Sequence, residues 1–119
     1  MADHNELGKK GEQLAIDFLI EEGYLILEKN YRYQKAEVDI IAQKEDILAV
    51  VEVKTRSTDY FGNPQDFVNP KKIKLLLSAI DYYVIEKDLD VEVRFDIIGI
   101  IYQNNTSKIE HLKDAFLHF

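Results

Sequence analysis

Four ionisable side chains lie among apolar residues in two stretches of the chain: Glu37 and Asp39 in one, Glu52 and Lys54 in the other. The two stretches read AEVDIIAQ and ILAVVEVKTR, and their β-branched residues are typical of β-strands. Because side chains alternate across a strand, residues two apart share one face. A charge placed among apolar side chains is costly unless a partner compensates it. The pattern therefore favours a set of groups that act together.

The polar segment QKEDI between the two stretches predicts an antiparallel hairpin that turns at residues 45–46. In that register Asp39 stands opposite Glu52, and Glu37 stands opposite Lys54. Directly opposed residues have Cβ atoms about 4.5–5.5 Å apart. One register therefore brings all four groups to the same face of the hairpin.

Two carboxylates at that separation repel each other unless a proton or a cation lies between them. Carboxylate oxygens suit Mg²⁺ or Mn²⁺, and Mg²⁺ commonly takes one or two protein carboxylates together with water and substrate phosphate. The Lys54 ammonium could hold the attacking water or stabilise charge that develops on a phosphate. These groups predict metal-assisted phosphodiester hydrolysis. The alternative is an ordinary cross-strand ion pair between Glu37 and Lys54 on a solvated face, with Asp39 and Glu52 as neighbours.

The rest of the chain predicts the elements that position this hairpin. Residues 6–22 repeat apolar positions with helical spacing, and Gly23 follows them as a stop signal. A second helix begins with Asn69 as N-cap and Pro70 in the first turn. Strands are expected at residues 24–33, 36–43, 47–56 and 91–102, with a short final strand within 108–116. The order predicts an α/β fold, a mixed β-sheet flanked by α-helices in a single domain of residues 1–119.

Two glycines, Gly8 and Gly11, lie on or beside the apolar stripe of the first predicted helix. Each costs about 1 kcal/mol relative to alanine inside a helix. We therefore expect another segment of the chain to approach the helix closely at both positions.

Composition limits the classes of function. The chain has 119 residues, 46% of them apolar, and no cysteine, which excludes disulfides and thiolate metal sites. No apolar run approaches the roughly 20 residues that span a bilayer, and the first residues lack the apolar segment of a signal peptide. We expect a soluble, cytoplasmic protein with no membrane partner. The formal net charge of −7 argues against a general nucleic-acid binder, so any contact with nucleic acid requires a local basic patch or a bound cation.

Such a basic patch is predicted at the start of the second helix, where Lys71, Lys72 and Lys74 crowd together. Lysines there oppose the helix dipole, whereas a phosphate there is favoured, which predicts contacts to a nucleic-acid backbone. Arg56 follows the second stretch and could hold a phosphate as well. The alternatives are exposed surface lysines and a surface salt bridge of Arg56.

Other polar residues are expected to be structural. Arg94 and Asp96 share a strand face and predict an ion pair. The three histidines, His4, His111 and His118, show no zinc-ligand spacing and are expected at the surface.

The two strand motifs also carry a family resemblance. EVD, a short hairpin and VEVK resemble the D…ExK signature of the PD-(D/E)xK nuclease superfamily, with Val38 where the superfamily name has proline. Over nearly the whole length, GKKGEQLAIDFLIEEGYLIL, AEVDIIA, VEVKTR, RFDIIGI and IEHLKDAF are similar in order and spacing to the uncharacterised YraN family of small bacterial proteins. The resemblance implies the restriction-endonuclease-like fold and a similarity to archaeal-type Holliday junction resolvases, which are dimeric Mg²⁺-dependent nucleases.

Carried over position by position, the resemblance makes Asp39 and Glu52 the metal ligands and Lys54 the catalytic lysine. Glu12 matches an additional acidic residue that such resolvases use, and Glu37 belongs to the YraN pattern without an assigned role. The resemblance implies a Mg²⁺- or Mn²⁺-dependent DNA endonuclease, with branched DNA as a candidate substrate and a homodimer as the candidate assembly. The alternative is a non-catalytic nucleic-acid-binding or protein-interaction module on the same fold.

Overall fold

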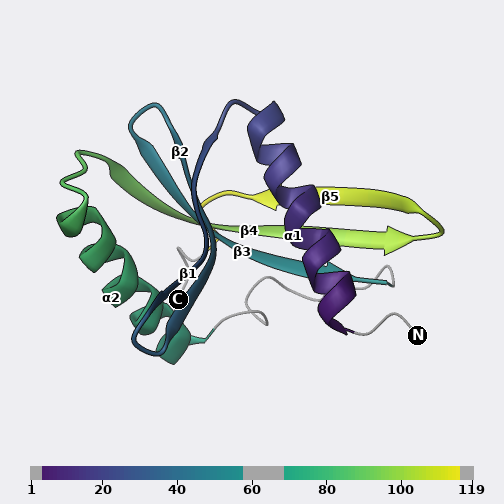
Figure 1. Cartoon of the computed structure of the whole chain (residues 1–119), viewed down its shortest axis with the longest axis horizontal. Helices are drawn as coiled ribbons and strands as arrows, with labels where there is room; N and C mark the ends of the chain where they lie inside the picture. The colour runs from purple at the N-terminus through teal and green to yellow at the C-terminus, as the bar shows by residue number, and fades with distance from the viewer. Residues whose placement is uncertain (1–3, 58–68, 116–119) are drawn as a thin grey trace.

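The computed structural model describes residues 4–57 and 69–115, which form two helices and five strands (Figure 1). The elements are α1 (His4–Glu21), β1 (Leu25–Tyr33), β2 (Ala36–Lys44), β3 (Ile47–Arg56), α2 (Pro70–Glu86), β4 (Glu92–Gln103) and β5 (Thr106–Leu112). The predicted order of helices and strands is confirmed. In the part of the chain that is described, neither helix has the length and apolar character needed to cross a membrane.

Both helix boundaries follow from local chemistry. Gly23 comes after the last turn of α1 with φ +96°, a conformation that glycine adopts without strain. The next backbone N–H, that of Tyr24, closes the helix end on the carbonyl of Leu19 at 2.9 Å. At the start of α2, the Asn69 side chain accepts a hydrogen bond of 2.8 Å from the backbone N–H of Lys72, as the predicted N-cap requires.

The strands form one mixed sheet in the order β1-β2-β3-β4-β5. Neighbouring strands are antiparallel except β3 and β4, which are parallel and are joined through α2. A parallel pair needs a long crossover connection, and the helix supplies it. The predicted mixed sheet is confirmed.

One helix packs against each face of the sheet. On one face α1 contributes Ala15, Ile16 and Leu19, which pack against Ile40, Ala42, Ala49, Val51, Ile98 and Ile100. On the other face α2 contributes Leu76, Ala79, Ile80 and Tyr83, which pack against Val38, Ile41, Leu48, Val50 and Ile97. The predicted arrangement, with a helix on each side of the sheet, is confirmed.

One of the two helical glycines allows a close approach. A Cβ atom added at Gly11 would lie 1.7 Å from Thr55 Oγ1, so α1 rests directly on the end of β3. A Cβ at Gly8 would meet nothing within 4 Å, so the prediction is confirmed at Gly11 and wrong at Gly8. Glu12 follows Gly11 in the helix and is thereby held close to the same end of β3.

Candidate active site

The β2–β3 hairpin has the register that the sequence predicts, because its ladder reaches Ile40 paired with Val51. The ladder ends there, one position before Asp39 and Glu52. From this point β2 stays paired with β1, and β3 stays paired with β4. Figure 1 shows the result: β3, β4 and β5 run to the right of the view, whereas β1 and β2 turn downward, away from them.

Asp39 fills the place where the two strands part. Its Oδ2 atom accepts a hydrogen bond of 2.8 Å from the backbone N–H of Val53. The Asp39 side chain therefore supplies the hydrogen-bond acceptor that the β2–β3 ladder no longer offers to the Val53 N–H. This bond holds the Asp39 carboxylate against β3, between the residues Glu52 and Lys54.

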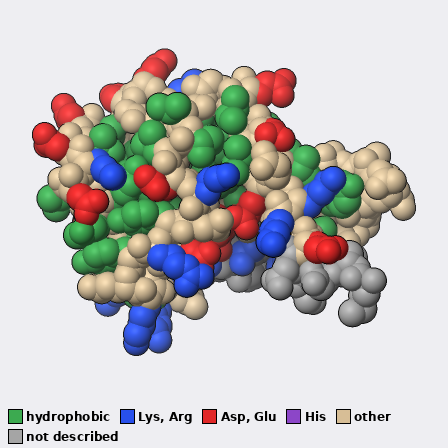
Figure 2. All heavy atoms as spheres, viewed as in Figure 1, with side chains coloured by type: hydrophobic (Ala, Val, Ile, Leu, Met, Phe, Trp, Pro, Cys, Tyr) green, Lys and Arg blue, Asp and Glu red, His purple; other side chains and the backbone are tan. Residues whose placement is uncertain are grey.

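The parting of the strands opens a cleft of about 390 Å³. It is lined by residues of the β1–β2 turn, β2, β3 and the first turns of α2: Lys35, Ala36, Glu37, Asp39, Glu52, Lys72, Leu75 and Leu76. Acidic and basic side chains lie close together across the lower middle of the face in Figure 2. The cleft gathers Asp39 and Glu52 from the two strand motifs and adds Lys72 from the helix.

Two lysines hold the Glu52 carboxylate, which is only 7% exposed. Lys72 Nζ lies 2.6 Å from Glu52 Oε1, and Lys54 Nζ lies 3.6 Å from the same oxygen. A buried carboxylate requires such compensation, because its desolvation costs several kcal/mol. The sequence predicts a phosphate contact for Lys72, and the structure adds an ion pair with Glu52 that sequence reasoning missed.

The Asp39 carboxyl is held differently. The pKa of Asp39 is raised to about 7, first by burial and second by the negative charge of Glu52. The Val53 N–H and the Lys72 ammonium oppose this shift, while Glu12 adds to it. Asp39 therefore lies in a place where its charge lacks full compensation.

Glu12 belongs to the same electrostatic neighbourhood. Burial raises the pKa of Glu12, the charges of Glu37 and Glu52 add to the shift, and a side-chain hydrogen bond with Asn30 lowers it. Acidic groups from α1, β2 and β3 thus converge on the parted strands. No set of three or more His, Cys, Asp or Glu side chains within residues 4–57 and 69–115 is arranged to hold a metal ion. The oxygen donors that could share a cation are Asp39 and Glu52.

The predicted pairing of Glu37 with Lys54 needs correction. Glu37 stands opposite Arg32 of β1, and Arg32 Nη2 lies 3.1 Å from Glu37 Oε2 in an exposed ion pair. The reason is the end of the β2–β3 ladder, which leaves β1 as the only strand beside Glu37 among the described elements. Glu37 still lines the cleft.

The other predicted phosphate contacts do not line the cleft. Lys71 and Lys74 are exposed on the first turns of α2. Arg56 is exposed at the end of β3, where its guanidinium donates to the Thr55 carbonyl at 3.1 Å. Their predicted role in binding nucleic acid stays a prediction.

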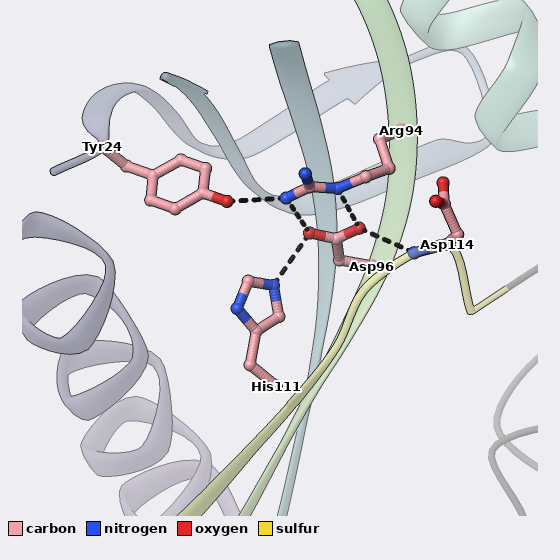
Figure 3. A network of polar contacts seen from close by, with 5 residues as sticks. All are labelled: Tyr24, Arg94, Asp96, His111 and Asp114. Carbon is pink, nitrogen blue, oxygen red and sulfur yellow. Dashed lines mark hydrogen bonds and ion pairs between the residues drawn. The ribbon is translucent and has the colours of Figure 1, made fainter. Parts of the chain in front are cut away.

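A second polar cluster lies between α1 and the sheet, and Figure 3 shows its members converging on Asp96. Asp96 is fully buried; Arg94 donates to both of its oxygens at 2.9 and 2.8 Å, and His111 Nε2 lies 2.8 Å from Oδ2. The backbone N–H of Asp114 also donates to Asp96, and Arg94 donates to the Tyr24 hydroxyl. The predicted ion pair of Arg94 and Asp96 is confirmed.

The predicted surface position of His111 is wrong, because its side chain is 8% exposed and its ring packs edge-on against Phe18. The imidazole contacts Asp96. Burial alone would raise the pKa of Asp96, but the hydrogen bonds and charges of His111 and Arg94 together outweigh it, so the pKa is lowered. No buried side-chain nitrogen or oxygen in the described part of the chain lacks a hydrogen-bond partner. The cluster is therefore a satisfied structural network. His118 and the side chain of His4 fall outside what the structure describes.

Comparison with known proteins matches residues 11–100 to the sequence model of the uncharacterised protein family UPF0102. The chain is 63% identical to a UPF0102 protein of Christiangramia forsetii and 60% identical to one of Flavobacterium psychrophilum, in each case over the full length of both chains. It is 49% identical to a UPF0102 protein of Bacteroides thetaiotaomicron, over 98% of this chain and 96% of that protein.

Proposed function

The chain belongs to the uncharacterised protein family UPF0102, and we propose that it is a metal-dependent DNA endonuclease that hydrolyses phosphodiester bonds. UPF0102 is the family that the resemblance to YraN proteins predicts. The resemblance of EVD and VEVK to the PD-(D/E)xK signature supports the finer assignment to that nuclease superfamily.

The observation that carries the proposal is the meeting of the Asp39 and Glu52 carboxylates with the Lys72 ammonium in one cleft, with Lys54 beside Glu52. Asp39 is fixed by the Val53 N–H, and Glu52 is held by Lys54 and Lys72. The groups come from separate elements and converge only because β2 and β3 part. A purely structural ion pair would not need a second acid whose pKa is raised to about 7 by burial and by its neighbour.

The donor set fits a hard divalent cation. Asp39 and Glu52 offer carboxylate oxygens, which Mg²⁺ and Mn²⁺ prefer, and Mg²⁺ needs few protein ligands when water and phosphate complete its shell. A bound ion would activate water and neutralise phosphate charge. Its double positive charge would also relieve the repulsion between Asp39 and Glu52.

The remaining groups have roles that follow from their positions. Lys54 lies beside Glu52 on the same strand face, where its ammonium can stabilise negative charge that develops on a phosphate or orient the attacking water. The charges of Glu37 and Glu52 contribute to the raised pKa of Glu12. Glu12 can therefore hold or accept a proton near the site.

DNA is the proposed partner, in spite of a net charge of −7. Lys35 and Lys72 line the cleft, and Lys71 and Lys74 lie exposed on the same end of α2. This local positive charge, together with a cation in the cleft, can offset the repulsion between an acidic protein and phosphates. Branched DNA is the proposed substrate and a homodimer the proposed assembly, both from the resemblance to Holliday junction resolvases.

The test is a cleavage panel on Holliday junctions, flaps, duplex and single-stranded DNA with Mg²⁺ and with Mn²⁺. Wild type should cleave at least one substrate only with metal, and Asp39→Asn and Lys54→Met should reduce the rate at least a hundredfold while remaining folded. Asp81 is exposed on α2, so Asp81→Asn serves as the matched control and should leave the cleavage rate unchanged. Absence of metal-dependent cleavage on every substrate would reject the enzyme.

A non-catalytic nucleic-acid-binding module is the second candidate. It is favoured by the lack of a preassembled set of three metal-holding side chains in the described residues. That function would give DNA binding without cleavage, and Asp39→Asn would not weaken the binding.

A further inference from the structure

Lys72 makes the shortest ionic contact in the cleft. Its ammonium lies 2.6 Å from Glu52 Oε1, although the two residues are 20 positions apart, one in β3 and the other in the first turn of α2. The Asn69 cap fixes the backbone of Lys72 in the first turn of α2 and so directs this side chain at the cleft. A lysine in the first turn opposes the helix dipole, so the contact with Glu52 has to compensate for an unfavourable position.

The Glu52 carboxylate is already compensated without a divalent ion. Its single negative charge faces the two ammonium groups of Lys54 and Lys72. Adding a doubly charged cation at Asp39 and Glu52 would place it within a few ångströms of both ammonium groups, and like charges at that distance repel strongly. One ammonium therefore has to leave, or new negative charge has to arrive.

Lys72 is the group in position to leave. It is in direct contact with Glu52 Oε1, one of the two carboxylate oxygens that a cation could bind, whereas Lys54 lies 1 Å further from that oxygen. Lys72 also reaches the cleft from the helix end, and its side chain is 34% exposed, so it can swing toward solvent or toward a bound phosphate. Lys54 belongs to the same strand as Glu52, two positions away, so its side chain starts from a fixed point beside that carboxylate.

We propose that Lys72 is a resident counter-cation, which pairs with Glu52 in the metal-free protein and yields that oxygen to a divalent ion. The released ammonium then binds a phosphate of the DNA. Lys72 is thus a positioning residue that couples metal binding to DNA binding. This inference rests on the proposed function, because it assumes that Asp39 and Glu52 hold the ion.

The first test measures Mn²⁺ binding to the full chain by titration calorimetry. Lys72→Met should bind Mn²⁺ about five- to tenfold more tightly than wild type, because the competing ammonium is gone. Lys74→Met removes the same charge from an exposed position on the same helix end and should change the affinity less than twofold. Equal affinity in wild type and Lys72→Met would overturn the inference. If no variant bound Mn²⁺, the proposed function would fail as well.

A second readout separates direct contact from long-range charge. In EDTA, Lys72→Met should lower the melting temperature, because Glu52 loses its nearest counter-charge; saturating Mn²⁺ should remove that difference. Lys74→Met should show neither effect. If the melting temperature of Lys72→Met stays lower than that of wild type in saturating Mn²⁺, Lys72 is only a structural partner of Glu52.

DNA binding gives the third readout, measured by fluorescence anisotropy on DNA with a cleavage-resistant backbone, so that the DNA stays intact and Lys54 stays in place. Mn²⁺ should tighten binding at least fivefold when Lys72 is present and less than twofold when Lys72→Met is added. The same gain in both proteins would exclude the transfer of Lys72 to phosphate. Metal-dependent cleavage together with that result would leave the proposed function standing and reject only the inference.

Discussion

Replacing Asp39 by asparagine should make the metal-free protein more stable at pH 8. The substitution removes the negative charge that burial and Glu52 disfavour, and the asparagine oxygen can still accept the hydrogen bond from Val53. Alanine would lose that bond, so asparagine isolates the effect of charge.

The size and sign of this change in stability follow from the titration of Asp39. Its pKa is raised from 3.8 to about 7 in the folded protein, so between these values the folded state binds more protons than the unfolded state. Wild-type stability therefore falls as pH rises through this window and reaches its full loss above pH 7. A shift of three units corresponds to at most about 4 kcal/mol. Because Asp39 lies in an open cleft where solvent screens part of the interaction, we expect a gain of about 1–2 kcal/mol for Asp39→Asn.

The assay is urea unfolding in EDTA at pH 8 and at pH 4, with Asp81→Asn as the control. The free energy of unfolding of Asp39→Asn should exceed that of wild type at pH 8, and most of this difference should disappear at pH 4. The Asp81→Asn change at an exposed position should alter the free energy of unfolding by less than about 0.5 kcal/mol at both pH values. An Asp39→Asn protein that is equally or less stable at pH 8 would refute the argument that the carboxylate is electrostatically strained.

Three further outcomes test the scaffold and the predicted DNA surface. Gly11→Ala should destabilise the fold by about 1–3 kcal/mol through the clash with Thr55, whereas Gly8→Ala, which meets nothing, should stabilise it by about 0.5–1 kcal/mol; thermal unfolding of both checks the pair. Asp96→Asn should cost about 3–5 kcal/mol in urea unfolding, because it leaves a buried guanidinium without its carboxylate, and a loss below 1 kcal/mol would contradict the structural network. Lys71→Glu should weaken DNA binding and lower the salt slope by about one, and an unchanged slope would exclude a phosphate contact.

The local parts of the fold could be predicted because the chemistry that fixes them is local. The hairpin register followed from the apolar strands and the polar turn between them, and it is the register of the pair Ile40 and Val51. The start of α2 followed from Asn69, whose side chain caps the helix as its type and position indicate. The helical spacing of apolar residues within 6–22 predicted α1, which the structure has at His4–Glu21.

The parts that failed depend on distant segments. His111 looked like a surface histidine because its buried partner, Asp96, lies on another strand, and local polarity does not reveal that contact. Lys72 looked like a phosphate contact only, because its pairing with Glu52 depends on how α2 sits against the sheet. Glu37 was placed opposite Lys54 because register alone does not show that the strands part.

The proposed nuclease activity requires that Asp39 and Glu52 bind one divalent ion together. The direct measurement is Mn²⁺ titration of wild type, Asp39→Asn, Glu52→Gln and the double variant by calorimetry. We expect one site per chain in wild type, at least a tenfold loss of affinity in each single variant, and little additional loss in the double variant. Wild-type affinity in Asp39→Asn or in Glu52→Gln would contradict a shared site.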